Sequence, residues 1–443
     1  MTTPVCDFVR RYGENHPIRA HMPGHKGVSH LGFEHLDITE LDGADSLYCA
    51  EGILAESEKN AGSLFQAHTF YSTEGSSQCI RAMLYLAKLY AKENRLPFKI
   101  AAGRNAHQVF VTAASLLALE VDWLYSKTDC SYLSCPLQPR ELNTFLQNHS
   151  VAAVYVTSPD YLGNTLDISA LAEVAHRHRC LLLVDNAHGA YLKFLDVSRH
   201  PMDCGADICC DSAHKTLSAL TGAAYLHINR NASALLSAHA KQALALFGST
   251  SPSYLILQSL DYLNWILSTD YRKNLQKFVS KVEGLKNRLK KNGYVLQGDE
   301  PLKITLSTKS YGYTGDDFSD ILKQKNLYTE FHDPDFAVLM LTPDHGDETL
   351  KQMEDILLSI PKLPKIQENP PAFSVPNRIL PPQEALYTPA ETVNTEDSLG
   401  RIVAFSGVSC PPAVPIAVSG EKIDKNILSA LRYYSVKTVK VVK

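Results

Sequence analysis

The sequence predicts an α/β protein built around a mostly parallel sheet. Through the middle of the chain, short apolar runs rich in branched residues alternate with longer segments of helical period, which is typical of a parallel sheet covered by helices. A complete strand–helix–strand unit is recognisable between residues 152 and 185. The 443 residues are also enough for two or three domains of about 150 residues each. We therefore expect a large α/β domain followed by smaller ones.

Five apolar runs are the predicted strands of the large sheet: residues 98–102, 152–157, 180–185, 207–210 and 223–228. Residues 167–179 lie between two of these runs, and their apolar side chains recur at three- and four-residue spacing, as in an amphipathic crossover helix. The same spacing predicts a helix over residues 78–94. These elements together give the βαβ arrangement that a parallel sheet requires.

The pattern changes after about residue 255. Residues 259–291 are predicted to form one or two helices that lead out of the large domain, with a single apolar stripe and a lysine-rich solvated face. Strands such as 303–306 and 337–341 then alternate with helices in a smaller α/β module. Prolines between residues 361 and 382 mark a connector that cannot be a regular helix. The predicted divisions are an amino-terminal segment, a large domain, a small α/β domain and a carboxy-terminal domain, at residues 1–50, 51–258, 259–365 and 366–443.

Composition and charge exclude several classes of protein. Hydrophobic residues make up 45% of the chain and charged residues 20%, as in folded globular proteins. The 43 Lys and Arg against 47 Asp and Glu give a net charge of −4, so there is no electrostatic reason to expect a nucleic-acid partner. The ten cysteines include no Cys-x-x-Cys pair, which argues against a zinc site and favours reduced thiols in the cytoplasm.

We also expect no membrane partner. The first residues lack an apolar run of signal-peptide length. The longest uncharged stretch, residues 402–420, is interrupted by Pro411, Pro412 and Pro415, whereas a spanning helix needs a nearly continuous apolar sequence. This stretch is therefore predicted to form strands and turns.

Two predicted strands end in residues that can carry chemistry. Lys215 follows the run 207–210 within the sequence Asp211-Ser212-Ala213-His214-Lys215-Thr216. Asp185 ends the very apolar run 180–185, at the carboxyl edge where open α/β sheets bind ligands. An amine and a carboxylate are thus predicted at the same edge of the sheet.

A third segment, residues 72–77, reads Ser-Thr-Glu-Gly-Ser-Ser and precedes the predicted helix 78–94. Gly75 lets the backbone approach an anion closely, and Ser76 and Ser77 offer hydroxyl donors. The helix N-terminus adds N–H groups and a positive dipole. We call residues 72–77 the anion-binding turn. An amine, a strand-end carboxylate and an anion site are what pyridoxal 5′-phosphate (PLP) requires, in the chain order of its commonest enzyme fold.

With these segments, the chain resembles the bacterial ornithine/lysine/arginine decarboxylase family. The similar segments are residues 21–27, 39–52, 75–77, 104–107, 185–190, 212–217, 249–254 and 411–421. The resemblance implies the aminotransferase-like PLP fold type I, with a mostly parallel sheet in the large domain, a smaller α/β domain and a C-terminal domain. It also implies decarboxylation of arginine, lysine or ornithine to the corresponding amine, as in polyamine metabolism.

The resemblance further implies roles for individual residues. Lys215 is similar to the lysine that binds PLP covalently, and Asp185 to the partner of the pyridine nitrogen. His107 is expected to stack on the ring, and His188 to lie near the phenolic oxygen. The residues expected around the phosphate are Gly75, Ser76, Ser77, Ser212 and His214. Lys215 or His214 is expected to protonate the substrate Cα, and no metal is predicted.

Two positions depart from the family pattern. Glu74 stands where Asn commonly precedes the glycine, and Gln108 follows His107 where Lys is common. A carboxylate beside a bound phosphate is unfavourable unless it points away or meets a cation. Glu421, Glu330 and Asp333 are the acidic candidates for binding a basic substrate side chain, although each one alone is better explained as a solvated loop residue.

The resemblance also implies a homodimer or a higher homo-oligomer, in which residues 249–254 reach the phosphate of the neighbouring subunit. The chain is similar to the short family form that lacks an amino-terminal receiver-like domain. Two other functions stay open at this point, because fold does not determine function. One is an aminotransferase or Cα–Cβ lyase on the same scaffold, and the other is a catalytically silent homologue.

Overall fold

The computed structural model describes residues 1–127, 131–406 and 412–443, so Pro411 of the similar segment 411–421 lies outside the described residues. The chain forms two compact units. The first consists of Met1–Pro97, Ala152–Val154 and Ile168–Leu275, and the second of Phe98–Val151, Tyr155–Asp167 and Gln276–Lys443. Both units are therefore assembled from separate stretches of the chain. The four-part division made from the sequence stays a prediction.

The main sheet confirms the predicted α/β class. Its seven described strands follow the order β1-β7-β6-β5-β4-β2-β3. In that order, their bounds are Ala67–Ser72, Ala224–Asn229, Ile208–Asp211, Leu181–Asp185, Ala153–Thr157, Lys99–Gly103 and Glu120–Leu124. All five predicted strands are present within one residue at each end. The two strands that were not predicted, β1 and β3, are the edges of the sheet.

Two smaller sheets are antiparallel. The first has the order β10-β11-β9-β8, with bounds Phe331–His332, Phe336–Met340, Lys303–Ser307 and Leu296–Gln297. The second has the order β12-β14-β13, with bounds Ala390–Asn394, Thr438–Val442 and Val403–Phe405. The predicted strands 303–306 and 337–341 are confirmed. In the uncharged stretch 402–420, the described residues hold β13 and turns, as predicted, and residues 407–411 lie outside the description.

The helices of the first half of the chain are α1 Pro4–Glu14, α2 Ile53–Phe65, α3 Gly75–Glu93, α4 Gln108–Leu116, α5 Pro139–Leu146, α6 Ile168–Arg177 and α7 Ala213–Thr216. They are followed by α8 Ala234–Ala238, α9 Ala240–Ala245, α10 Tyr254–Ser268, α11 Tyr271–Lys291, α12 Gly315–Gln324, α13 Gly346–Leu358, α14 Pro382–Tyr387 and α15 Lys425–Tyr433. Short 3₁₀ helices lie at Glu34–Leu36, Leu47–Cys49, Ala190–Phe194, Thr308–Tyr311, Pro343–His345 and Thr395–Asp397. Among the described residues, every helix is too short or too polar to cross a lipid bilayer.

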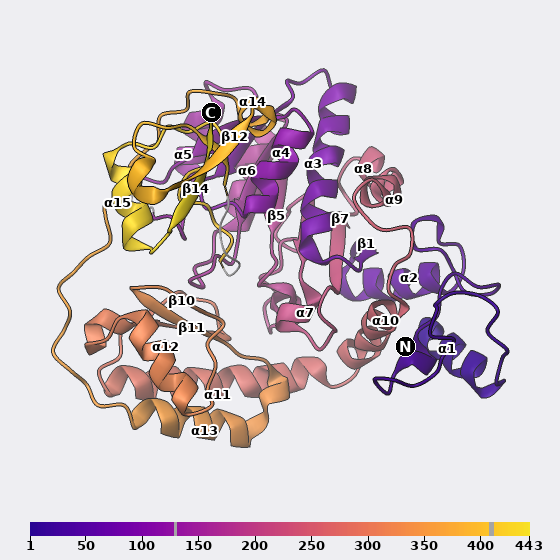
Figure 1. Cartoon of the computed structure of the whole chain (residues 1–443). Coiled ribbons are helices and arrows are strands. Elements are labelled where there is room, and N and C mark those ends of the chain that lie inside the picture. Colours follow the sequence, from indigo (N-terminus) through magenta and orange to yellow (C-terminus); the bar gives the residue numbers. More distant parts are fainter. Residues whose placement is uncertain (128–130, 407–411) are drawn as a thin grey trace. The chain divides into compact units, whose positions relative to one another are not determined.

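Helix α3 packs across β1, β5, β6 and β7 in the first unit (Figure 1). Its apolar residues Cys79, Met83 and Leu86 are fully buried, as the helical spacing requires. Strand β5 is buried along its whole length, which explains why its sequence is a continuous apolar run. The core of this unit thus lies between α3 and the sheet.

A buried carboxylate joins β6 to β7 and to the segments that hold His200 and Asn186. Asp211, the last residue of β6, receives hydrogen bonds at Oδ2 from His200 Nε2 at 2.9 Å and from His227 Nε2 at 3.2 Å. Burial alone would raise the pKa of Asp211, but electrostatic attraction and hydrogen bonds from the two histidines outweigh burial and hold the pKa well below its usual range. Asn186 Nδ2 donates to the other oxygen at 2.7 Å, which ties the segment after β5 to the end of β6. Both oxygens of the Asp211 carboxylate therefore accept hydrogen bonds.

We expect Asp211→Asn to lower the free energy of unfolding by about 3 to 5 kcal/mol, because it removes one partner from a buried, hydrogen-bonded charge network. Urea unfolding at pH 7 measures the change, and Asp270→Asn, at an exposed position in the same unit, is the control. A carboxyl group with a lowered folded-state pKa stabilises the fold fully above its unfolded pKa of about 4 and loses that effect as the pH falls further. The difference between the two proteins should therefore shrink below pH 4, and equal midpoints at pH 7 would contradict the assignment.

Candidate active site

The directions of the strands bring Lys215, Asp185 and the anion-binding turn to one edge of the sheet in the first unit. Strand β7 is antiparallel to both β1 and β6, so β1 and β6 run in the same direction. Strand β5 is parallel to β6. The carboxyl ends of β1, β5 and β6 therefore lie at the same edge, which is where open α/β sheets bind ligands.

Lys215 and His188 meet at this edge. Lys215 lies in α7, directly after β6, and His188 lies three residues beyond the end of β5. Lys215 Nζ is 3.0 Å from His188 Nε2, and His188 is 5% exposed while Lys215 is partly exposed. The amine thus has a hydrogen-bonded imidazole beside it and access to solvent, as a nucleophile with an adjacent base requires.

Asp185 is fixed at the end of β5, where it is 3% exposed. Its Oδ1 accepts a hydrogen bond from the Ala187 amide at 3.2 Å and from the Cys210 thiol at 3.6 Å. Burial raises the pKa of Cys210 well above its usual value, so the thiol keeps its proton and acts as the donor. A backbone amide just after β5 and a side chain of β6 therefore orient the carboxylate.

The anion-binding turn forms the start of α3, which begins at Gly75 rather than at residue 78. Gly75 has a φ of +69°, a conformation that favours glycine, and its amide donates to the Gly222 carbonyl at 2.8 Å. The Ser76 hydroxyl is 2.9 Å from the Ser212 hydroxyl. Ser77 lies in the same first turn of the helix. Two hydroxyl groups and the free amides of a 19-residue helix are thereby gathered in one place.

His214 borders the same turn. Its Nδ1 is 2.9 Å from the Ala223 carbonyl oxygen, so Nδ1–H donates and the tautomer is determined by the backbone. A side chain at position 75 would bring its Cβ to 3.9 Å from His214 Cε1. The structure therefore brings together the predicted residues Gly75, Ser76, Ser212 and His214.

Glu74 points to the backbone of a distant segment. It is the N-cap residue of α3 but makes no capping bond; instead, Oε1 accepts a hydrogen bond from the Ser249 amide at 2.5 Å. The preceding residue, Gly248, packs so tightly that a Cβ would lie 1.9 Å from Tyr48 Oη. Glu74 and Gly248 together hold residues 248–249 against the start of α3.

His107 lies in the second unit, where it is the N-cap residue of α4. Its Nδ1 accepts a hydrogen bond from the Val109 amide at 3.1 Å. Its stacking on the cofactor ring stays a prediction. Gln108, which replaces the common Lys, donates its backbone amide to the Ala413 carbonyl at 2.8 Å within the same unit.

The three acidic candidates for substrate recognition also lie in the second unit. Glu421 is 1% exposed and lies 3.2 Å from Arg104 Nη2, so it is an internal ion-pair partner rather than a solvated loop residue. Glu330 accepts a hydrogen bond from the Tyr161 hydroxyl at 3.4 Å. Asp333 is 8% exposed and lines a cavity described below. Burial thus contradicts the expectation of solvation for Glu421 and Asp333.

Sequence reasoning missed the buried network of Asp211, in which Asn186, His200 and His227 are the hydrogen-bond partners. The available signal was Asp211 itself, which ends an apolar strand just as Asp185 does. His200 and His227 gave no signal, because their contacts with Asp211 are set by tertiary structure. This network could in principle attract a metal, since His200, Cys209 and Asp211 lie close together. However, His200 Nδ1 accepts the Met202 amide at 3.3 Å, so its Nε2 carries the proton given to Asp211 and offers no lone pair.

The fold and this edge define a fold type I PLP-dependent enzyme. The structure supplies the features that PLP needs from a protein: the amine of Lys215, the oriented carboxylate of Asp185, and a glycine turn with hydroxyl groups at a helix N-terminus. Residues 3–343 match the family model "Orn/Lys/Arg decarboxylase, major domain". The chain belongs to this family.

Known proteins of the same kind match over almost the whole chain. The arginine decarboxylase of Bacillus subtilis (strain 168) is 26% identical over 463 residues, covering 96% of this chain and 92% of its own. The arginine decarboxylase of Bacillus anthracis is 26% identical, covering 97% and 92%. The Francisella novicida lysine decarboxylase LdcF shares the fold, with a TM-score of 0.79 at 17% identity over 100% of this chain and 81% of its own.

These findings decide among the functions left open by the sequence. The protein is a PLP-dependent decarboxylase of a basic amino acid, as the resemblance implied. The aminotransferase, lyase and silent-homologue alternatives are not supported. PLP and a small-molecule substrate are thereby confirmed, and the roles of individual residues remain proposals.

We expect Glu74→Gln to strengthen PLP binding about two- to fivefold, because it removes a negative charge at the N-terminus of α3 while its amide oxygen still accepts the Ser249 hydrogen bond. Fluorescence titration of the protein with PLP measures the dissociation constant. Glu93→Gln removes the same charge at the other end of the helix and should leave the constant unchanged. Unchanged or weaker binding by Glu74→Gln would show that Glu74 does not act on the phosphate site.

Proposed function

We propose that the enzyme decarboxylates arginine, with Lys215, Asp185, His188 and His214 acting at the reacting atoms. Arginine is chosen because the curated relatives that match nearly the whole chain are named arginine decarboxylases. The observation that carries the site assignment is the 3.0 Å contact between Lys215 Nζ and His188 Nε2 at the edge where Asp185 is held. Bound PLP supplies a carbonyl carbon that captures amines covalently and a ring that accepts the electron pair released when CO₂ leaves.

Lys215 is the residue that holds the cofactor, and His188 controls the protonation of the Lys215 amine. An ammonium group cannot attack a carbonyl carbon, so Nζ must first lose a proton. His188 Nε2 lies within hydrogen-bond distance of Nζ and can accept that proton. After loss of CO₂, the ammonium form of Lys215 or the imidazolium form of His214 would deliver a proton to the substrate Cα. Helix α7 carries both donors on neighbouring residues.

Asp185 binds the far end of the cofactor ring. The Ala187 amide and the Cys210 thiol hold the carboxylate at the end of β5, so it would need no reorganisation to accept a hydrogen bond from the protonated ring nitrogen. Keeping that nitrogen protonated strengthens the ring as an electron acceptor. Burial at 3% exposure keeps water from competing for the carboxylate.

The phosphate is proposed to bind at the start of α3. The amides of Ser76 and Ser77 and the hydroxyls of Ser76 and Ser212 are the donors, supported by the 2.9 Å contact between the two hydroxyls. The Gly75 amide donates to the Gly222 carbonyl instead, so Gly75 contributes its left-handed backbone turn. His214 closes this site from α7. His107 is proposed to stack on the ring, a role that rests on the family resemblance alone.

The protein is proposed to act as a homodimer in the cytoplasm. Ser249, Thr250 and Ser251 are exposed in the protomer, which suits a segment that reaches a second copy. The described cysteines carry free thiols, and this fits a reducing compartment. Neither nucleic acid nor a membrane is proposed as a partner.

We expect Lys215→Ala to lower decarboxylation of arginine by at least about a hundredfold, because it removes both the covalent anchor and a proton donor. Borohydride reduction followed by peptide mass spectrometry should place a pyridoxyl adduct on Lys215 of the wild type. Lys59→Ala, at an exposed position of α2, should retain adduct and activity. An adduct on another lysine would overturn the site assignment, and amine and CO₂ from lysine or ornithine but not arginine would overturn the substrate.

Gel filtration of the active enzyme should give a mass about twice the protomer mass of 49.0 kDa. Residues 249–254 are expected to complete the neighbouring site, so dilution to monomer should remove activity. An active monomer would refute the dimer proposal.

A further inference from the structure

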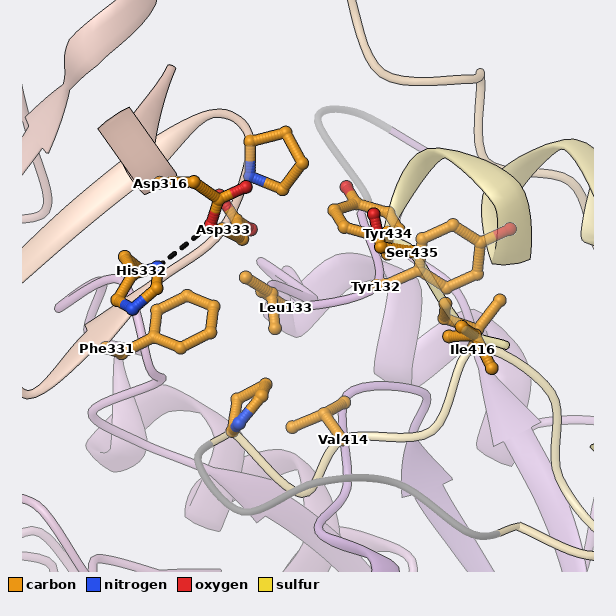
Figure 2. A pocket seen from close by; sticks show the side chains of 13 residues that line it. Tyr132, Leu133, Asp316, Phe331, His332, Asp333, Val414, Ile416, Tyr434 and Ser435 are labelled. Carbon is orange, nitrogen blue, oxygen red and sulfur yellow. Dashed lines mark hydrogen bonds and ion pairs between the residues drawn. The ribbon is translucent and has the colours of Figure 1, made fainter. Parts of the chain in front are cut away.

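A cavity of about 400 Å³ lies within the second unit. Figure 2 shows Asp316, Phe331, His332 and Asp333 on one side of it, and Tyr132 and Tyr434 on the other. The first group comes from α12 and from β10 with the turn after it, whereas Tyr434 follows α15. The volume is within the range of pockets that bind small organic molecules.

One side of the cavity carries two carboxylates. Asp333 Oδ1 accepts hydrogen bonds from the amides of Asp335 and Phe336, each at 2.8 Å, so its side chain is held in place. Asp316 is next to it and pairs with His332 Nδ1 at 2.9 Å. Among the described residues that line the cavity, there is no lysine or arginine. Burial and, to a lesser extent, the negative charges of the nearby Asp335 and Asp316 raise the pKa of Asp333 to about 7, so a cation in the cavity would stabilise its ionised form.

The remaining lining is mainly aromatic and aliphatic. Phe331 and Tyr434 contribute rings from opposite sides, and Tyr132 lies 6.2 Å from Tyr434 between ring centroids. Aromatic rings attract organic cations, and apolar walls favour a ligand with a hydrocarbon chain. A carboxylate pair facing such walls is complementary to an aliphatic chain that ends in a positive charge.

The two sides of the cavity are connected by a polar network. The Tyr433 hydroxyl at the end of α15 donates to Asp335 Oδ1 at 2.6 Å, in the turn that carries Asp333. Lys309 Nζ lies 3.1 Å from the same oxygen. Lys309 therefore forms an ion pair with Asp335, and it is not among the residues that line the cavity. Because the walls are joined in this way, a ligand would meet a preformed site.

We propose that this cavity binds an aliphatic amine or guanidine, with its cationic end at Asp333 and Asp316 and its carbon chain against Phe331 and Tyr434. The cavity's preference for an organic cation follows from its own residues. The choice of agmatine, putrescine and cadaverine as probes rests on the proposed function, since these are the amines that decarboxylation of basic amino acids yields. The enzyme would thus carry a second site for amines, formed by residues other than those assigned to catalysis.

Calorimetric titration of the full-length holoenzyme tests the proposal, after borohydride reduction so that the active site cannot capture amines covalently. We expect saturable binding of at least one of the three amines, and no binding of 1,4-butanediol, the uncharged analogue of putrescine. Asp333→Asn should weaken binding about tenfold or more, because Asn retains the oxygen that accepts the two amides but has no charge. Asp320→Asn, at an exposed position on α12 and outside the cavity, should bind like the wild type.

Absence of saturable binding, equal binding by Asp333→Asn and wild type, or an equal loss in Asp320→Asn would each overturn the proposal. If Asp333→Asn fails to fold, as judged by thermal unfolding, Asp316→Asn replaces it and should also weaken binding. Its side chain is 57% exposed, so the fold does not depend on it. The titration does not use decarboxylation, so its failure is separable from failure of the proposed function, which adduct mapping on Lys215 decides.

Discussion

The direction of β7 is the constraint on which the catalytic edge depends. This strand runs against both β6 and β1, so the chain that leaves β6 through α7 must turn back at the edge where β1 ends. The returning loop places the Gly222 carbonyl on the Gly75 amide. Lys215 follows β6, and the anion-binding turn follows β1, about 140 residues earlier. The reversed direction of β7 brings these two segments to the same edge of the sheet.

Buried polar groups then fix the two central strand ends relative to each other. Asn186 reaches from the segment after β5 to Asp211 at the end of β6, and Cys210 reaches back from β6 to Asp185. These contacts are costly to leave unsatisfied inside the core, so they specify one relative position of the two segments. Lys215 and Asp185 therefore occupy defined positions before any ligand binds, which is the condition for preorganised catalysis.

The sequence predicted the central strands well, because strands buried on both faces appear as continuous apolar runs, and β5 is the clearest case. Edge strands β1 and β3 escaped prediction because polar and charged residues such as His68 and Asp122 interrupt their apolar patterns. The three chemical segments were found from local sequence, since each lies within six residues of a strand end. Contacts across long separations were not predictable: Glu74 is 175 residues from Ser249, and Glu421 is 317 residues from Arg104. The second of these explains why Glu421 was misjudged as a solvated residue.

The interleaved course of the chain has a consequence for biosynthesis. The first unit takes its residues from three stretches and is complete only at Leu275, after the chain has already supplied two stretches of the second unit. The segments Phe98–Val151 and Tyr155–Asp167 must therefore wait for Gln276–Lys443 to emerge from the ribosome before their own unit can close. Neither unit corresponds to one uninterrupted gene fragment, so folding during translation cannot proceed one domain at a time, and the main sheet has all seven of its described strands only once Asn229 has been made.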